Sequence, residues 1–443
     1  MMNQALFSEN KVSKTYIHMA LPLVFSLVVT LIYNLADTFF VAQTNNTNLV
    51  AGVSLGTPLF TLLMALGNIF GQGGSSLISR MLGQQDHENV QHVSAFCFYV
   101  TIFIGIVIAA VMLVFRNPIL YVIGANAETY SYASSYYIYL AVGAPIIMLS
   151  FIHSNFLRSE GMSKESMIGT ILGALVNIVL DPIFISALDW GASGAAVATV
   201  IGYLCADIYF ILVVAKKSAS LSVDPKKIKV SIQHMGQILG IGIPAAIVNV
   251  MQSASVVLMN QFLLPYGNEK IAAMGIVLKV NMIALLILTG FAFGGQPMFG
   301  FYYGAGDKKR MRELFQFCLR FIGLISLGLT VLLFLAAPLL MRSFMSNETI
   351  VADGTIMLRW QVISTLFVGI ILLLTILFQS TGKVAGSFIL SISRQGVVFL
   401  LVLIIAYHTV GYMGILVSQA IADVFTAVLA GILFYKQLYR EFR

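Results

Sequence analysis

The stretch Asn177-Ile178-Val179-Leu180-Asp181-Pro182 lies inside an otherwise apolar run over residues 167–188. Inserting a carboxylate into a membrane within such a run costs roughly 2.5–3.5 kcal/mol, so it persists where it faces a wet cavity, a partner or a cation. Asn177 and Asp181 are four residues apart and therefore share one face of a helix. Pro182 removes a backbone donor directly after the acid, which predicts a kink there. The stretch predicts an ion or proton site buried in a membrane.

Composition supports a membrane protein. Of the 443 residues, 59% are hydrophobic and 10% are charged, whereas a soluble domain carries about 25% charged residues. The net charge of +7 does not gather on a soluble domain, so we expect no nucleic-acid partner. The cysteines, Cys97, Cys205 and Cys318, lie far apart in apolar runs and are interpreted as small hydrophobic residues.

About twelve runs are long enough to cross a bilayer, which needs about 20 mainly apolar residues per helix. We predict spans at 15–40, 50–78, 93–115, 130–157, 165–188, 193–215, 236–264, 270–300, 313–340, 350–378, 385–408 and 412–435. With the N-terminus inside, most of the 25 lysines and arginines fall in cytoplasmic loops, as the positive-inside rule requires. Both termini are therefore expected to be cytoplasmic.

The two halves of the chain repeat each other. Leu82-Gly83-Gln84-Gln85-Asp86 follows the second span, and Tyr303-Gly304-Ala305-Gly306-Asp307 follows the eighth at an equivalent position. We predict a first lobe at 1–215, a cytoplasmic linker at 216–233 and a second lobe at 234–443. Two lobes related by internal duplication are typical of transporters, so we expect a carrier and not an enzyme.

Two acids within the spans, Asp37 and Asp181, have no counterpart in the second half. Tyr33, Asn34 and Asp37 share one helical face. Because packing alone would favour the same residue in both halves, this asymmetry indicates function in the first lobe. The alternatives are a helix-end acid touching outside water for Asp37 and a packing residue at a kink for Asp181.

Asp207 and Asp423 occupy similar places in the sixth and twelfth spans. Since both halves keep them, we interpret them as polar contacts between helices. Lys279 either orients a charged substrate or extends its amine to the membrane surface.

Two motifs are decoys. The histidines of His87-Glu88-Asn89-Val90-Gln91-His92 are five residues apart, which does not fit the spacing of a zinc protease. Gly71-Gln72-Gly73-Gly74 lacks the lysine that ends a phosphate-binding loop. We therefore expect an ion gradient as the energy source, with no cofactor other than Na⁺ or H⁺ as coupling ion.

The chain resembles the multidrug and toxic compound extrusion (MATE) family over nearly its whole length. The resemblance is carried by Tyr33-Asn34-Leu35-Ala36-Asp37, by Ala65-Leu66-Gly67-Asn68-Ile69-Phe70-Gly71 and by the stretch from Asn177 to Pro182. It implies an all-α integral membrane protein with about twelve transmembrane helices in two pseudo-symmetric six-helix lobes. It also implies export of lipophilic organic cations, such as drugs or dyes, in exchange for Na⁺ or H⁺ across a bacterial plasma membrane.

The resemblance assigns the first-lobe cation site to Asp37, Asn177, Asp181 and Thr199. Their oxygens suit Na⁺, and the two carboxylates are equally able to carry a proton.

One branch of the family carries further acids in the seventh and tenth spans. Here those spans offer Asn249, Gln252 and Gln361, with Asp353 at an outer end, which argues against a second ion site.

The substrate cavity is expected to contain aromatic and amide side chains whose faces suit flat cations. The candidates are Tyr33, Tyr136, Asn155, Gln252 and Lys279. We expect a monomer in the lipid bilayer.

Two alternatives stay open. A lipid-linked precursor flippase would share the architecture but normally needs a strongly cationic cleft, and arginine is sparse within these spans. A channel or receptor is the other class, and counterflow of preloaded substrate would separate a carrier from a pore.

Overall fold

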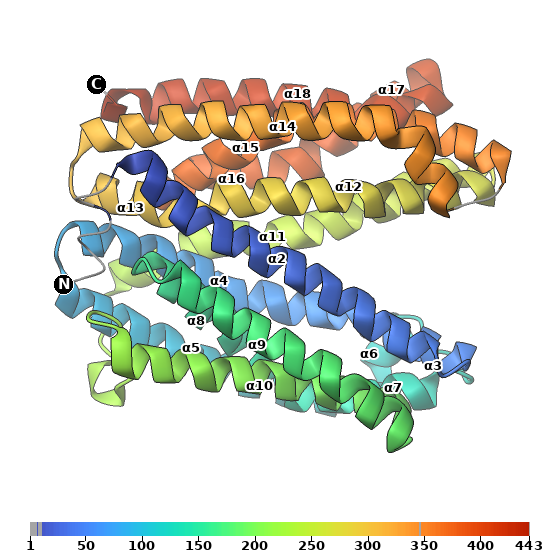
Figure 1. The fold of residues 1–443 in the computed structure, drawn as a ribbon, viewed down its shortest axis with the longest axis horizontal. Coiled ribbons are helices and arrows are strands. Elements are labelled where there is room, and N and C mark those ends of the chain that lie inside the picture. Colours follow the sequence, from blue (N-terminus) through green and yellow to red (C-terminus); the bar gives the residue numbers. More distant parts are fainter. Residues whose placement is uncertain (1–6, 8–10, 345–346, 443) are drawn as a thin grey trace. The chain divides into compact units, whose positions relative to one another are not determined.

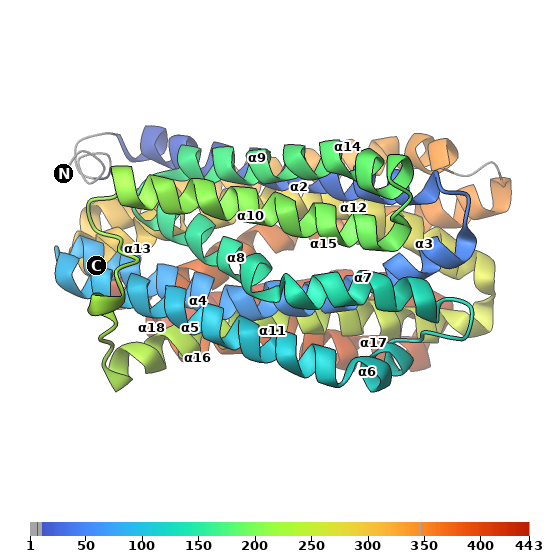
Figure 2. The same cartoon turned by 90° about the horizontal axis from the view of Figure 1, so that it is seen from below.

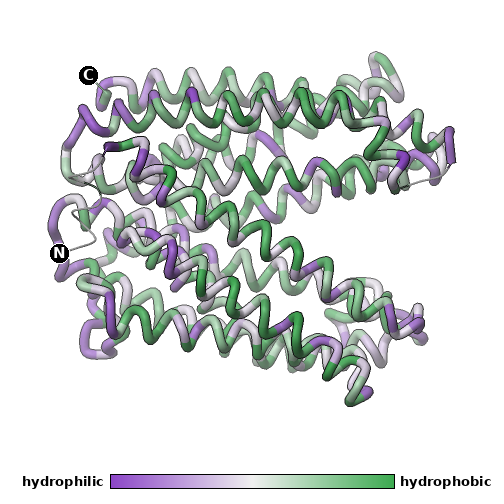
Figure 3. The backbone as a smooth tube through the Cα atoms, in the orientation of Figure 1, coloured by the Kyte–Doolittle hydropathy of each residue, from purple (hydrophilic) through white to green (hydrophobic). Residues whose placement is uncertain are grey.

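Apolar helices make up almost all of the structure. The computed structural model describes residue 7 and residues 11–344 and 347–442. Within these ranges every regular element is helical and no strand is formed. Figure 3 shows hydrophobic residues along the middle of the helices and hydrophilic residues mainly at their ends and in the loops. A helix satisfies its own backbone hydrogen bonds, as a segment in hydrocarbon must.

The elements follow the chain as labelled in Figure 1. Those of the first half are α2 (Val12–Ala42), α3 (Thr47–Ser54), α4 (Thr57–Gly83), α5 (His87–Val114), α6 (Arg116–Val122), α7 (Tyr130–Val142), α8 (Ala144–Ser159), α9 (Ser163–Pro182), the π-helix η1 (Ile183–Ala187), α10 (Gly191–Lys217) and η2 (Pro225–Lys227). Those of the second half are α11 (Ile232–Leu263), η3 (Leu264–Tyr266), α12 (Asn268–Gly294), α13 (Gln296–Gly304), α14 (Lys308–Phe344), α15 (Glu348–Ser380), α16 (Val384–Ile392), η4 (Ser393–Val397), α17 (Val398–Val410), α18 (Tyr412–Gln437) and η5 (Tyr439–Phe442).

The predicted number of spans is confirmed. Among the described residues, eleven helical segments are long and apolar enough to cross a membrane, or up to twelve if the bent pair α7 and α8 forms one span. That pair bends by 53° between Val142 and Ala144. Pro145 stands in the first turn of α8, where its missing N–H removes a hydrogen bond that a straight helix would make. The protein is a multi-pass, all-α membrane protein.

The chain forms two compact units, which are described separately. The first contains Phe25–Gly242, and the second contains Lys11–Val24 together with the chain from Ile243 onward. The sequence assigned all of α2 to the first lobe and all of α11 to the second. The boundary between the compact units instead runs through both helices. It lies close to Pro22 in α2 and close to Pro244 in α11. A proline removes a helical hydrogen bond and lets the two parts of a helix follow different neighbours.

The expected linker, residues 216–233, is bound to the first unit. The buried Glu160 carboxylate accepts hydrogen bonds from the Ser218 hydroxyl at 2.5 Å and from the next two backbone N–H groups at 2.9 Å each. The Ser94 hydroxyl accepts from the N–H of Ser222 at 2.9 Å and donates to its carbonyl at 3.2 Å. The start of the linker is therefore a structural part of this unit and not a free tether.

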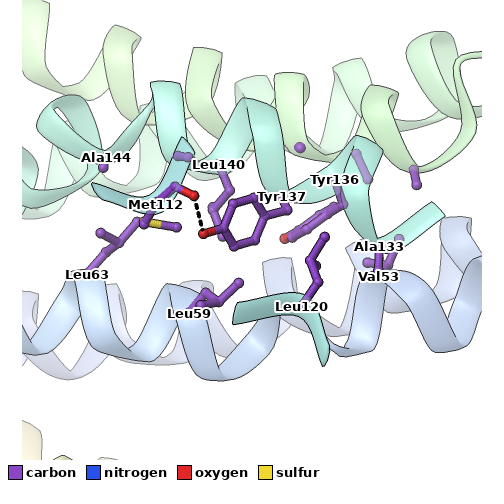
Figure 4. Close-up of a cluster of buried hydrophobic side chains, with 14 of the residues drawn as sticks. Val53, Leu59, Leu63, Met112, Leu120, Ala133, Tyr136, Tyr137, Leu140 and Ala144 are labelled. Atoms are coloured by element: carbon purple, nitrogen blue, oxygen red, sulfur yellow. Dashed lines mark hydrogen bonds between the residues drawn. The ribbon is translucent and has the colours of Figure 1, made fainter. Parts of the chain in front are cut away.

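An apolar core fixes the helices around the bend between α7 and α8. Tyr137 is 1% exposed and donates its hydroxyl to the Met112 carbonyl at 2.7 Å, which spares the ring the cost of an unpaired buried hydroxyl (Figure 4). Leu59, Leu63 and Leu140 lie around the ring. The neighbouring Tyr136, also on α7, is thereby held in a defined place.

In the second unit α15 is the central helix, packed against α12, α14 and α18. Its core includes Val277, Leu358 and Leu416, all at most 1% exposed. The Asp353 carboxylate pairs with Lys270 on α12, and Lys270 also lies over the Tyr412 ring. The outer acid of the tenth span is thus engaged by a lysine.

The Glu160 contact predicts a pH dependence of stability. Burial raises the pKa of Glu160 above its ordinary value of 4.5, and the hydrogen bonds from the linker offset only part of that rise. The folded protein then holds a proton more tightly than the unfolded chain, so this contribution is complete below pH 4.5 and is lost as pH rises through the raised pKa. Relative to Glu160→Gln, which does not titrate, the free energy of unfolding of the wild type should fall as pH rises. Thermal unfolding in detergent from about pH 4 to pH 8 measures this, and a constant or rising difference would contradict it.

Candidate functional site

The site begins with the close approach of α9 and α10, which lie side by side in Figure 2. A Cβ atom on Gly173 would lie 2.8 Å from the Gly202 carbonyl oxygen, and one on Gly202 would lie 2.7 Å from that of Gly173. Only glycine permits this contact, because real Cβ atoms essentially never approach to under 3.0 Å. Small residues at a helix interface allow backbones to pack this closely in membranes. The contact brings Asn177 of α9 against α10.

Asn177 joins Asp181 to Thr199. In the amide orientation that satisfies both ends of its side chain, Nδ2 donates to Asp181 Oδ2 at 3.2 Å and Oδ1 accepts from the backbone N–H of Thr199 at 3.1 Å. Asp181 is 0% exposed, Asn177 2% and Thr199 3%. These three predicted site residues form one buried polar group.

Pro182 ends α9 directly after the acid, where the sequence predicted a kink. The chain continues as the π-helix η1, in which the N–H of Leu188 donates to the Ile183 carbonyl at 2.8 Å. A π-turn is a common response to a disturbed α-helical hydrogen-bond ladder and is frequent at functional sites. The backbone beside Asp181 is thus irregular.

The last part of α2 brings Tyr33 and Asp37 to this group. Tyr33 is buried and its hydroxyl interacts with Thr199. The Asp37 and Asp181 carboxyls are close enough to interact electrostatically. Asp37 Oδ1 is buried and has no hydrogen-bond partner among the described residues. Asn34, predicted as a supporting residue, is exposed at its position on α2.

Aromatic rings border the two acids. Tyr136 interacts electrostatically with both Asp37 and Asp181, and its ring fills the space beside Gly56. Tyr203 interacts with Tyr33 and packs against the rings of Phe60 and Phe151 at centroid distances of 5.9 and 6.1 Å. Sequence reasoning missed Tyr203, although its place four residues after Thr199 on an α-helix was a usable signal.

Three further residues were predicted to line a substrate cavity. The Asn155 amide is occupied within α8, since Nδ2 donates to the Phe151 carbonyl at 2.6 Å and Oδ1 accepts from Arg158 at 2.6 Å. Gln252 and Lys279 belong to the second unit and are exposed on α11 and α12. These two residues thus belong to a different unit from Asp37 and Asp181.

The donor atoms of the group are oxygens from carboxyl, amide and hydroxyl groups. Hard oxygen ligands suit Na⁺, and a proton shared between the acids would likewise reduce their negative charge. Within the described ranges no cluster of three or more histidine, cysteine, aspartate or glutamate residues is arranged for a transition metal. The unpaired Asp37 oxygen fits a bound cation or proton, because a buried carboxylate oxygen without a partner is costly.

Fold and site together define an internally duplicated helical membrane protein with a buried polar site in one unit. A family model described as MatE matches residues 22–183 and, again, residues 244–405. The chain therefore belongs to the MATE family, as the resemblance of its motifs indicated.

Relatives agree with this assignment. The chain is 32% identical over 429 residues to multidrug export protein MepA of Staphylococcus aureus (strain MRSA252), which covers 97% of this chain and 95% of that protein. It is also 32% identical to multidrug export protein MepA of Staphylococcus haemolyticus (strain JCSC1435), over 97% of this chain and 94% of that protein.

Solved structures share the fold. One, described as the outward-facing conformation of a multidrug resistance MATE family transporter of the MOP superfamily, has a TM-score of 0.92 at 24% identity and covers 100% of this chain and 98% of its own. Another, a MOP superfamily transporter from Pyrococcus furiosus whose binding pocket is described as having reverse polarity, has a TM-score of 0.91 at 24% identity and covers 99% and 98%.

The glycine contact gives a test of how the site is positioned. Gly202→Ala places a Cβ atom against the Gly173 carbonyl and should separate α9 from α10, at a cost of about 1–3 kcal/mol in stability. Gly328→Ala in α14 is the control, since nothing lies within 4 Å of its Cβ position and alanine favours a helix. Thermal unfolding in detergent compares them, and equal stability of the two variants would refute the contact.

Proposed function

We propose that the protein is a secondary active multidrug efflux antiporter that exports lipophilic organic cations in exchange for Na⁺ or H⁺. The observation that carries the proposal is the proximity of Asp37 and Asp181 in the buried polar group of the first unit. Family membership and the named multidrug export relatives support the same activity.

The two acids supply the coupling. Two carboxylates in a poorly hydrated site repel each other, so the pair favours one bound proton or Na⁺ over two bare charges. Binding of that cation from outside favours a rearrangement of the first lobe that weakens substrate binding. Loss of the cation inside favours the drug-accepting state. Coupling of this kind requires the cation to bind the two states with different affinity.

The irregular backbone after Pro182 is where the rearrangement is easiest. An α-helix that changes to a π-helix has already lost regular hydrogen bonds beside Asp181. A change in the charge of that carboxyl therefore acts on a segment that needs little further energy to move. The gradient supplies the work, about 2.3 kcal/mol per charge for each 100 mV.

The rings beside the acids suit the proposed substrates. Tyr33 and Tyr136 interact electrostatically with Asp37, and a cation over the face of an aromatic ring gains about 0.5–2 kcal/mol. A lipophilic cation and a coupling ion would then compete for the same negative region. Asn155, Gln252 and Lys279 stay predictions as substrate contacts.

The proposal includes a location. The protein would lie in a bacterial plasma membrane as a monomer with both termini in the cytoplasm, the orientation that the placement of lysine and arginine favours.

Substitution of either acid tests the function. Asp37→Asn and Asp181→Asn keep the size of the side chain but remove the charge that holds the cation. We expect gradient-driven dye efflux to fall about tenfold or more in each, within the usual range of coupling energies. The matched control is Asp189→Asn, an exposed acid after the same helix, which should transport as the wild type does.

The measurement uses proteoliposomes with Na⁺ and pH gradients imposed separately, normalised to the amount of folded protein. Near-normal efflux by either variant would remove that acid from the mechanism. Substrate flux that follows neither gradient would reject antiport itself.

A further inference from the structure

One face of α10 carries a line of polar side chains through the first unit. Thr199, Tyr203 and Asp207 follow each other at intervals of four residues, so they point to the same side of the helix. Over eight residues an α-helix rises about 12 Å. The line therefore leads from the site around Asp37 and Asp181 toward the end of α10 that carries the linker.

Tyr33 of α2 interacts with this line. It interacts with Thr199 and Tyr203 and also, electrostatically, with Asp37. Tyr203 in turn interacts electrostatically with Asp207. The tyrosines thus connect the proposed coupling site to a second buried acid.

Asp207 faces a buried histidine. His153 Nδ1 on α8 lies 3.9 Å from Asp207 Oδ1, and the two side chains are 3% and 4% exposed. Neither ring nitrogen and neither carboxyl oxygen makes a hydrogen bond within the described part of the chain. The gap is slightly longer than a hydrogen bond, so a small side-chain shift or one water molecule closes it. Burying both groups this way is costly unless they share a proton.

Serine, tyrosine and phenylalanine side chains lie against the pair. Ser150 of α8 and Tyr203 of α10 lie beside Asp207, while the Phe98 ring of α5 and the Phe210 ring of α10 lie beside His153. The neighbours named here are all uncharged.

A small cavity adjoins His153 on the side of the linker. Tyr99 donates a hydrogen bond at 2.9 Å to the carbonyl of Val223, which fixes the linker over this end. The cavity is lined by Ser94, Phe98, His153, Phe156, Leu221 and Ser222. Serine hydroxyls and backbone groups of the linker provide partners for a proton leaving the imidazole.

The second unit lacks this arrangement at its corresponding acid. Asp423 accepts hydrogen bonds at 3.2 Å from Arg394 and from Gln419. Arginine stays charged at any physiological pH and does not pass a proton on. A duplicated position thus has a permanent ion pair in one unit and a titratable pair in the other.

We propose that Tyr33, Tyr203, Asp207 and His153 form a proton pathway from the Asp37 and Asp181 site to the linker end of the first unit. The pathway rests on the proposed antiport and assigns the proton as its coupling ion. In the proposed orientation the linker end is cytoplasmic, so the pathway releases inside the protons that the site takes up outside.

The transfer conserves atoms and protons. A proton leaves the carboxylic acid formed by Asp37 and Asp181 and binds Tyr33, whose own hydroxyl proton passes to Tyr203. Tyr203 passes its proton to the Asp207 carboxylate, and Asp207 gives it to a ring nitrogen of His153. The imidazolium then releases one proton to water in the cavity, and every hydroxyl has its proton again.

The test compares two activities of the same proteoliposomes. The first is transport under a pH gradient. Its proton flux is read with a pH dye inside the vesicles, and its substrate flux is measured alongside. The second is exchange of labelled for unlabelled substrate without a gradient. In Asp207→Asn and His153→Gln we expect the first to fall about tenfold or more while exchange stays within about twofold. In Tyr203→Phe we expect proton flux to fall by a similar factor. Asp207→Glu should restore part of the proton flux.

Controls separate the possible outcomes. Cys205→Ser, two residues from both Tyr203 and Asp207 on α10, should behave as the wild type. Equal loss of both activities in Asp207→Asn and His153→Gln would indicate a structural role and overturn the pathway, as would wild-type proton flux in Asp207→Asn or transport driven by Na⁺ alone. None of these results touches the proposed antiport, which instead fails if Asp37→Asn transports normally.

Discussion

The first unit is organised around the cost of taking carboxylates out of water. Asp181 is fully buried, and its one amide partner, Asn177, is itself held by the backbone of α10. Asp37 has a buried oxygen with no partner among the described residues. Such an arrangement is stable with a proton or a cation present and strained without one. The close glycine contact between α9 and α10 and the bordering aromatic rings keep this group in place. The π-helix after Pro182 leaves the neighbouring backbone easy to deform.

The two halves of the chain match the same family model, but they differ in the buried acids that they carry. The family model matches both halves, yet only the first carries acids equivalent to Asp37 and Asp181. Where both halves retain an acid, its partner differs: His153 approaches Asp207, and Arg394 holds Asp423. Arg394 and Asp423 form an ion pair. The pair of His153 and Asp207 is the one to which the proposed proton pathway gives a changing charge.

Much of this was accessible from sequence because the membrane imposes strong patterns. The spans follow from apolar length, and Asn177 and Asp181 share a face because helical spacing requires it. His153 was missed because its relevance depends on which helices pack together, and no local pattern specifies that α8 lies against α10. The sequence predicted a cytoplasmic linker at 216–233 but not its attachment to the first unit. Glu160 and Ser94 bind mainly backbone groups of the linker, which no side-chain pattern marks.

The division of α2 and α11 between the units means that the chain passes from one unit to the other inside helices and not in the linker. Residues 11–24 belong to the first half of the chain but are part of the second unit, and residues 232–242 open the second half but are part of the first unit. The two halves therefore exchange segments, in the manner of a domain-swapped pair joined in one polypeptide. A cut between residues 228 and 231 would separate the two halves of the chain. Each fragment would then contain part of a helix that belongs to the unit formed mainly by the other fragment.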